Sequence, residues 1–390
     1  MTRIRTLVVI LAGGAGGRLE LLTRTRAKPA VPFAGTHKLI DFPLSNCHNS
    51  GIQDVWVAQQ YNPISLSDHM ANGRPWDLDR TMGGLLLLQP RLGQDEREGF
   101  QQGTADSLWR NAPLIREFAP DALVVVSADA VYKLDYGALV EEHVEAAADV
   151  TMVTYRVDPD DAGRYGVVQA EDGRIREYVY KPEDPKGDLI ANEVFVFKPG
   201  SMLDLLDELA EQAGDDGLQD LGNELLPRLV DGGTARESRF EAYWRDVGTI
   251  DAYFDAHMDL LDEESPIVLD DPAWPILTKA PTRRASARLR RGAEVADALV
   301  GPTADVSGTV ERSVIGRGCV IEPGAVVRDA VLLEGVVVRS GARVVRAIVD
   351  EDVEVGADAT VGEPDGELAL VGEDVGRGAS VGAGGRHPEE

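Results

Sequence analysis

The hydrophobic pattern of residues 1–262 alternates between short apolar runs rich in Val and segments whose apolar residues recur every three or four positions. The short runs are typical of strands covered on both faces, and the second pattern is typical of helices packed on a sheet. We predict strands at 6–12, 55–59, 123–127, 150–155 and 194–197, and helices at 107–118, 201–213 and 250–261. This alternation predicts a doubly wound α/β sheet with its ligand at the carboxyl ends of the strands.

A different period follows a stretch with several prolines at 263–285, which we interpret as a linker. Aliphatic residues then recur about every six positions, with glycines between them: Ile315, Ile321, Val327, Val338, Val344, Val355 and Val361. A six-residue period predicts one inward side chain per flat side of a parallel β-helix, and a β-sandwich of short strands is the alternative. The expected organisation is an α/β domain at 1–262, the linker, and a β-helix at 286–385.

The composition restricts the partners that this chain of 390 residues can have. Its net charge of −28 argues against nucleic acid, whose phosphates need a basic surface. No apolar stretch reaches the roughly 20 residues of a membrane span, so no membrane partner is expected. Cys47 and Cys319 form no metal-binding pattern, and so few cysteines suit a reducing compartment. We therefore expect a cytoplasmic location.

The first predicted strand runs directly into a glycine-rich loop that is followed by Arg18 and, ten residues later, by Lys28. Glycines lack a Cβ, so backbone N–H groups can crowd around an anion while the two cations neutralise it. A Walker A loop is excluded because Arg18-Leu19 stands where Lys-Ser/Thr is needed, and Leu19 also replaces the third glycine of a dinucleotide fingerprint. The loop predicts a nucleoside triphosphate site built on Gly13, Gly14, Gly16 and Gly17.

Several longer motifs occur in an order that identifies a family. They are LAGGAGGRL, RAKPAVPF, KLIDFPLSNCHNSGI, QQYNPISLSDHM, GTADSLWRN, SADAVYKLDY, YKPEDP, DLGNELLP and YWRDVGTIDAY. Over nearly its whole length the chain resembles the bacterial ADP-glucose pyrophosphorylases, or glucose-1-phosphate adenylyltransferases. The resemblance implies a nucleotidyltransferase domain followed by a left-handed β-helix, an Mg²⁺-dependent reaction of a sugar 1-phosphate with a nucleoside triphosphate, and assembly into a homotetramer or a dimer.

The resemblance also implies a set of site residues. The catalytic residues are Arg18 at the departing pyrophosphate, Lys28 at the α-phosphate, and Asp129, which follows a predicted strand and holds the metal together with Asp246. Two carboxylates with phosphate and water oxygens suit Mg²⁺, although either aspartate alone could be a helix cap. The implied nucleotide-binding residues are Leu11, Ala12, Gly13, Gly14, Gly16, Gly17, Gln60, Gln102, Gly103 and Thr104. The implied sugar-phosphate residues are Tyr180, Lys181, Glu193, Asp220 and Trp244.

The chain departs from the family pattern around the sugar. Tyr180 replaces the Glu of Glu-Lys-Pro, Ala191 and Phe195 replace the Ser and Tyr of Ser-Met-Gly-Ile-Tyr, and Leu221 replaces the Phe of Asp-Phe-Gly. The pocket should therefore be less polar and discriminate less between acceptors. ATP with glucose 1-phosphate is the first expectation. A cyclitol phosphate of the valienol 1-phosphate type, with ATP or GTP, and glucosamine 1-phosphate are alternatives.

A different class of function is a regulatory subunit without catalysis. Retention of the charged motif residues argues against it: Arg18, Lys28, Asp129, Lys181 and Asp246. Thr36 stands where the family has an activator-responsive lysine, so regulation by sugar phosphates is not expected. No histidine lies between His257 and His387, so the β-helix has no obvious acyltransferase base and is expected to be structural.

Overall fold

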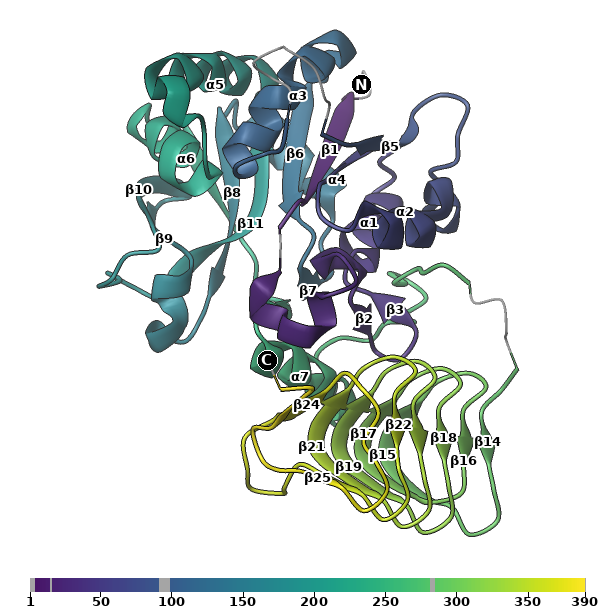
Figure 1. Cartoon of the computed structure of the whole chain (residues 1–390). Helices are drawn as coiled ribbons and strands as arrows, with labels where there is room; N and C mark the ends of the chain where they lie inside the picture. Colours follow the sequence, from purple (N-terminus) through teal and green to yellow (C-terminus); the bar gives the residue numbers. More distant parts are fainter. Residues whose placement is uncertain (1–3, 15, 91–98, 281–284, 390) are drawn as a thin grey trace. The chain divides into compact units, whose positions relative to one another are not determined.

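The computed structural model describes residues 4–14, 16–90, 99–280 and 285–389 (Figure 1). Its contacts divide the chain into two compact units. Unit 1 comprises the chain up to Gly14, Phe42–Ala128 and Lys133–Trp244, and unit 2 comprises Ala15–Asp41, Asp129–Tyr132 and Arg245–Glu390. Short segments of the N-terminal half thus belong to the same unit as the C-terminal β-helix. The expected boundaries at 262 and 285 stay predictions.

Unit 1 is built on a nine-stranded sheet with the order β5-β4-β1-β6-β11-β8-β12-β10-β9. The strands β5, β4, β1 and β6 are parallel, whereas β11 runs antiparallel to both β6 and β8. Every predicted strand is confirmed within a few residues. The strand bounds are β1 Thr6–Ala12, β4 Asp54–Gln59, β5 Gly84–Leu88, β6 Ala122–Ser127, β8 Val150–Arg156, β9 Gly166–Glu171, β10 Arg174–Tyr180, β11 Leu189–Phe197 and β12 Ala235–Arg239.

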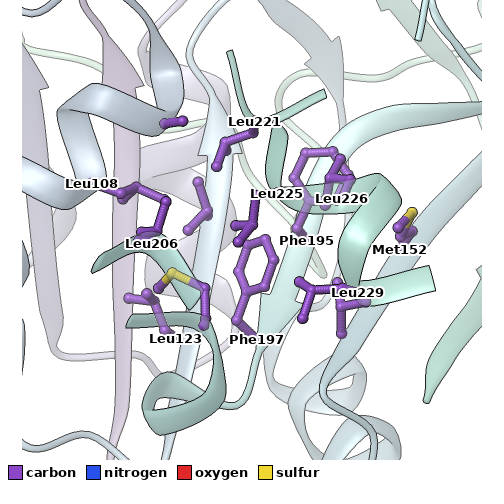
Figure 2. Packing of buried hydrophobic residues seen from close by; sticks show 14 of the residues in the cluster. Leu108, Leu123, Met152, Phe195, Phe197, Leu206, Leu221, Leu225, Leu226 and Leu229 are labelled. Atoms are coloured by element: carbon purple, nitrogen blue, oxygen red, sulfur yellow. The ribbon is translucent and has the colours of Figure 1, made fainter. Parts of the chain in front are cut away.

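Helices α3, α5 and α6 bury their apolar stripes against one face of this sheet, as Figure 2 shows for Leu108, Leu206 and Leu225, which lie in one cluster with Phe197 of β11. In α5 the buried residues recur at helical spacing, which explains why this segment is a helix on a sheet. The predicted helices are confirmed, and the third ends at Met258 before a short 3₁₀ turn. The helix bounds are α1 Asp41–Asn49, α2 Pro63–Met70, α3 Thr104–Phe118, α4 Tyr136–Glu145, α5 Pro199–Ala213, α6 Leu221–Asp231 and α7 Ile250–Met258.

The C-terminal part of unit 2 is a stack of parallel β coils (Figure 1). Val310 pairs with Val327, and Val327 pairs with Val344, so one coil takes 17 residues at this point. The predicted inward residues, such as Ile321 and Val355, are fully buried. Parallel pairing between successive coils confirms the β-helix and excludes the β-sandwich, and the pattern is consistent with the left-handed form.

Two parallel sheets carry most of these coils. The first has the order β14-β16-β18-β20-β22, with bounds Arg288–Leu289, Asp305–Val306, Val320–Ile321, Val337–Val338 and Glu354–Val355. The second has the order β15-β17-β19-β21-β23-β25, with bounds Glu294–Val300, Thr309–Ile315, Val326–Leu332, Arg343–Val349, Thr360–Val361 and Ser380–Val381. Strand β24, Ala369–Val371, pairs with β21 and with β26, Arg386–His387.

The segment 16–41 packs on the β-helix inside unit 2. The 3₁₀ helix η1 (Gly17–Thr23) contributes Leu21, whose Cδ1 lies 3.2 Å from the Cβ position on Gly372. A Cβ on Gly35 would lie 3.1 Å from the carbonyl oxygen of Ile315. The segment that carries Gly16, Gly17 and Lys28 is therefore supported by the β-helix. Among the described residues, no helix is both long and apolar enough to cross a membrane.

Candidate active site

Gly16, in the part of the glycine loop that belongs to unit 2, is packed directly on the segment of Lys28. Gly16 has φ 71, and a Cβ placed on it would lie 2.9 Å from Thr23 Cγ2 and 3.0 Å from Lys28 Cβ. The Thr23 hydroxyl donates to the Gly16 carbonyl at 3.0 Å and fixes the turn. Both the left-handed backbone and the crowding therefore require glycine at this position. Gly17 has open space around its Cβ position, so packing does not require a glycine there.

Lys28 opens the 3₁₀ turn η2 (Lys28–Ala30) and forms an ion pair with Asp129. The Lys28 Nζ lies 2.5 Å from Asp129 Oδ2, and the lysine is 8% exposed. Asp129 directly precedes β7 (Ala130–Tyr132), which pairs with β13 (Trp244–Asp246). The Val247 N–H donates to the Asp129 carbonyl at 3.0 Å, so the chain just before β7, with Asp129, lies beside the end of β13, with Asp246.

Arg18 and Asp246 converge on Gly248. A Cβ on Gly248 would lie 2.8 Å from Asp246 Oδ2 and 3.4 Å from Arg18 Nη2. The glycine thus leaves room for a carboxylate and a guanidinium to approach each other. Unit 2 contains all four of the predicted charged residues of the triphosphate and metal site: Arg18, Lys28, Asp129 and Asp246.

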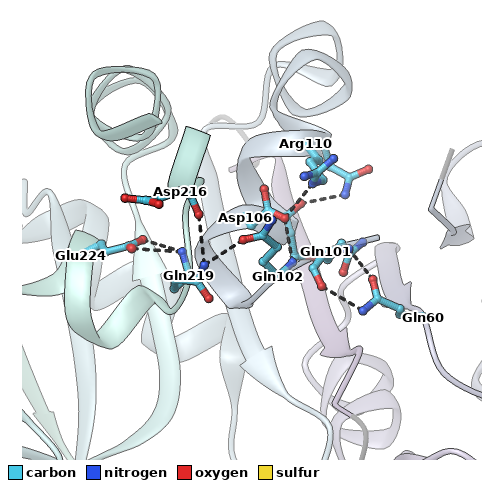
Figure 3. Close-up of polar contacts among 10 residues, drawn as sticks. Gln60, Gln101, Gln102, Asp106, Arg110, Asp216, Gln219 and Glu224 are labelled. Atoms are coloured by element: carbon cyan, nitrogen blue, oxygen red, sulfur yellow. Dashed lines mark hydrogen bonds and ion pairs between the residues drawn. The ribbon is translucent and has the colours of Figure 1, made fainter. Parts of the chain in front are cut away.

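In unit 1, the predicted nucleotide-binding residue Gln60 forms hydrogen bonds with the loop that precedes α3 (Figure 3). The Gln60 side chain bonds the main chain of Gln101 in both directions, donating to its carbonyl at 2.9 Å and accepting from its N–H at 2.5 Å. Both polar atoms of Gln60 therefore hold this loop in place. The Cβ position on Gly13, just after Leu11 and Ala12 at the end of β1, lies 3.4 Å from Gln101 Oε1.

The next turn of this loop is held by the buried Asp106. Its carboxylate accepts from the Gln102 N–H at 2.8 Å and from the Arg110 Nε at 2.7 Å (Figure 3). A Cβ on Gly103 would lie 2.2 Å from the Gln219 carbonyl oxygen, so only glycine allows this approach. The sequence placed Asp106 inside the motif but gave it no role. Its spacing of four residues from Arg110 on a helix was the available signal.

The predicted acceptor residues of unit 1 begin with a cluster around Tyr180. The Tyr180 hydroxyl lies 3.5 Å from Asp220 Oδ2, and the other oxygen of Asp220 accepts from the Thr104 hydroxyl at 3.3 Å. The ring of Tyr180 rests on Gly222, whose Cβ position is 2.2 Å from the ring atom Cδ2. Thr104, predicted on the nucleotide side, is thus connected through Asp220 to the acceptor side.

Lys181 extends this cluster. Its Nζ lies 4.6 Å from the centroid of the Tyr180 ring, within the range of a cation–π interaction. Burial tends to lower the pKa of Lys181, but the Tyr180 hydroxyl and the carboxylates of Glu193 and Asp220 outweigh it and raise this pKa. Lys181 and Glu193 both have positive φ, 46 and 64, which is unusual for side chains of this size. Such backbone strain tends to gather at functional sites.

Trp244 lies among aromatic side chains, with ring centroids 5.4 Å from Tyr155 and 5.6 Å from Tyr165. The Tyr165 carbonyl accepts from the Lys181 N–H at 2.9 Å, which links Trp244 to the acceptor cluster. Within the described part of the chain, the Trp244 Nε1 and both amide atoms of the buried Asn192 have no hydrogen-bond partner. Buried polar groups are normally paired. Sequence reasoning missed Tyr165 and Asn192, which stand outside the charged motifs.

Comparison with known proteins gives the family. The Nucleotidyl transferase model matches residues 7–263, and the model of the GlmU-like C-terminal hexapeptide matches residues 280–368. A glucose-1-phosphate adenylyltransferase of Thermomicrobium roseum is 41% identical over 91% of this chain and 83% of that protein. The chain belongs to the glucose-1-phosphate adenylyltransferase family.

Other relatives agree with this membership. The glucose-1-phosphate adenylyltransferase of Clostridium beijerinckii is 37% identical, over 85% of each chain. That of Fusobacterium nucleatum is 36% identical, over 84% of this chain and 85% of the relative. The resemblance seen in the motifs is confirmed, and this member of the glucose-1-phosphate adenylyltransferase family is a nucleotidyltransferase enzyme, a class that generally uses a divalent metal ion.

Proposed function

We propose that the chain joins ATP and glucose 1-phosphate to give ADP-glucose and pyrophosphate. A phosphate oxygen of the sugar phosphate attacks the α-phosphorus of ATP. The bond from that phosphorus to the oxygen bridging to the β-phosphate breaks, and pyrophosphate leaves with the electron pair. The observation that carries the proposal is the charged cluster of unit 2, in which β7, directly after Asp129, pairs with β13, which ends at Asp246, and Lys28 bonds Asp129.

The reaction forms no covalent enzyme intermediate, so the protein contributes alignment and charge stabilisation. Lys28 offsets the negative charge that develops around the α-phosphate, and Arg18 binds the departing pyrophosphate. The buried Lys28 is neutralised by Asp129. A buried ammonium group needs such a partner, because desolvation disfavours an isolated charge.

Asp129 and Asp246 fit Mg²⁺. Carboxylate oxygens are its preferred protein ligands, and one or two of them suffice when phosphates and water complete the coordination. Among the described residues, no group of three or more His, Cys, Asp or Glu side chains could hold a metal ion. When bound, Mg²⁺ would neutralise charge on the phosphates.

On the nucleotide side we assign Leu11, Ala12, Gly13, Gly14, Gly16, Gly17, Gln60, Gln102, Gly103 and Thr104. Gln60 acts by holding the main chain of Gln101. On the acceptor side we assign Tyr180, Lys181, Glu193, Asp220 and Trp244, with Lys181 as the cation for the sugar phosphate. A cytoplasmic location and a homotetramer belong to the same proposal and are supported by the family alone.

The test compares Lys28→Ala with Lys198→Ala. The control removes a lysine whose side chain is 63% exposed and whose carboxylate partner, Asp149, is 3.9 Å away. Purified proteins are assayed for pyrophosphate release and ADP-glucose formation from ATP, glucose 1-phosphate and Mg²⁺. Lys28→Ala should lower kcat about 100- to 1,000-fold, the usual effect of removing one preorganised charge contact, and the control should stay within about twofold. Equal kcat values for folded Lys28→Ala and wild type would exclude the assigned role.

A further inference from the structure

Arg26, two residues before Lys28, is anchored by the β-helix. Its Nη1 lies 2.7 Å from Asp350 Oδ1, and its Nη2 lies 3.0 Å from Glu351 Oε2. Both acidic residues follow β21 in the β-helix, more than 300 positions away in sequence. Arg26 is 8% exposed, so its guanidinium is largely withdrawn from water and depends on these partners.

The surroundings of Arg26 are consistent with a fixed charge network. Burial by itself would lower the pKa of Arg26, but the carboxylates of Asp350 and Glu351 outweigh it and raise this pKa. Burial raises the pKa of Glu351, while Arg26 and Lys38 act in the opposite direction. Segment 16–41 is tied to the β-helix a second time, because Arg386 binds Glu20 through both carboxylate oxygens.

The anchored Arg26 is close in sequence to the proposed catalytic residue Lys28. Ala27 alone separates Arg26 from Lys28, and it has an extended backbone with φ −65 and ψ 146. The Lys28 Nζ then bonds Asp129, and the Lys28 Cβ lies against Gly16 of the glycine loop. A rigid link from Asp350 to Arg26 therefore determines where the chain enters η2 and where Lys28 is presented.

We propose that Arg26 is a positioning residue and that the β-helix, through Asp350 and Glu351, fixes the catalytic Lys28. The β-helix then contributes to the reaction from within a single protomer, in addition to any role in assembly. This inference rests on the proposed function, because it assigns to Asp350 an effect that is transmitted through Lys28.

The experiment measures kcat and both KM values for Asp350→Asn in the full-length protein. Asparagine keeps the shape and removes the charge that holds Arg26. We expect kcat to fall about 10- to 100-fold with each KM within about threefold, because a small displacement of a catalytic group acts on the transition state. Glu351→Gln is a milder variant that should fold in any case and lower kcat by about threefold, since only one of the two contacts weakens. Asp329→Asn is the control: its partner Arg312 lies on the β-helix, and it should leave kcat unchanged.

A double-mutant cycle separates positioning from general stability. The low activity of Lys28→Ala is measured with a radiometric assay and long incubations. In this background, adding Asp350→Asn should lower kcat no further. The same fold-loss in both backgrounds would show that Asp350 does not act through Lys28 and would overturn the inference. Unchanged kcat for both Asp350→Asn and Glu351→Gln in an active enzyme would also overturn it. A wild-type enzyme that released no pyrophosphate would instead refute the proposed function.

Discussion

Gly222→Ala should selectively weaken use of the sugar phosphate. Gly222 lies in the first turn of α6, and the Cβ of alanine would be 2.2 Å from Cδ2 and 2.4 Å from Cε2 of the Tyr180 ring. Ordinary contact begins near 3.4 Å, so the ring must move by at least 1.2 Å, the difference between 3.4 and 2.2 Å. That movement separates the ring from Lys181 and the hydroxyl from Asp220.

The size of the effect follows from the contacts that are lost. The cation–π contact contributes about 0.5–1 kcal/mol. The hydrogen bond from Tyr180 to Asp220 is long at 3.5 Å, so it contributes about 1–1.5 kcal/mol, less than the roughly 1.5–3 kcal/mol of a well-formed bond to a charged group. Together these predict a loss of about 1.5–2.5 kcal/mol, which is roughly 10- to 70-fold in kcat/KM for glucose 1-phosphate. The protein should still fold, because alanine is favoured over glycine in a helix by about 1 kcal/mol and offsets part of the strain.

The assay varies glucose 1-phosphate at saturating ATP and then ATP at saturating glucose 1-phosphate. Only the first series should change substantially, since Tyr180 is assigned to the acceptor. The matched control is Gly232→Ala at the other end of α6, where the Cβ position is 3.4 Å from its nearest neighbour, Leu229 O. A folded Gly222→Ala enzyme with kcat/KM within twofold of Gly232→Ala would refute the role given to Tyr180.

Three further outcomes are expected. Asp129→Asn should lower kcat at least 100-fold and weaken Mn²⁺ binding followed by EPR, because the metal loses a charged ligand; a folded variant with normal turnover would remove this assignment. Burial lowers the pKa of His143 and His257 from 6.5 to about 4, so as the pH falls the unfolded chain binds protons before the folded chain does. The free energy of unfolding should therefore decrease as the pH drops from 6.5 towards 4, by up to roughly 3 kcal/mol per histidine. The free energies of unfolding in urea at pH 7 and pH 5 should differ less for His143→Gln than for wild type, and an equal difference would contradict this. Light scattering should give a homotetramer, and a clean monomer at micromolar concentration would reject assembly but not the fold.

The local pattern of apolar and polar residues predicted most of the fold. The strand β1 (Thr6–Ala12) has the predicted bounds, and the six-residue period correctly gave the interior of the β-helix, for example Ile315 and Val361. Strand direction was not predictable, because an apolar run such as that of β11 reads the same in both directions. The bulge of β11 between Ala191 and Phe195, where Glu193 has φ 64, likewise leaves no signal in a pattern of apolar residues.

Some residues of the candidate site could be predicted from the sequence and others could not. Charged residues inside motifs could be recognised, and the structure brings Lys28 and Asp129 into contact. Contacts between distant segments could not be recognised, because nothing in the sequence links Arg26 to Asp350 across 324 positions. Polar groups that are conspicuous only when buried, such as Asn192, also needed the structure.

The most direct test of the central claim is a matrix of ATP, GTP and the other nucleoside triphosphates against several 1-phosphates, scored by pyrophosphate release. The acceptors are glucose 1-phosphate, glucosamine 1-phosphate and valienol 1-phosphate. The account predicts the highest kcat/KM for ATP with glucose 1-phosphate, and measurable activity with the altered rings, because the replacements at Ala191, Phe195 and Leu221 are expected from the sequence to make the acceptor pocket less polar. A preference for glucose above about a thousandfold, roughly 4 kcal/mol, would contradict the relaxed pocket. Absence of pyrophosphate release from every combination would contradict the assignment as a nucleotidylyltransferase.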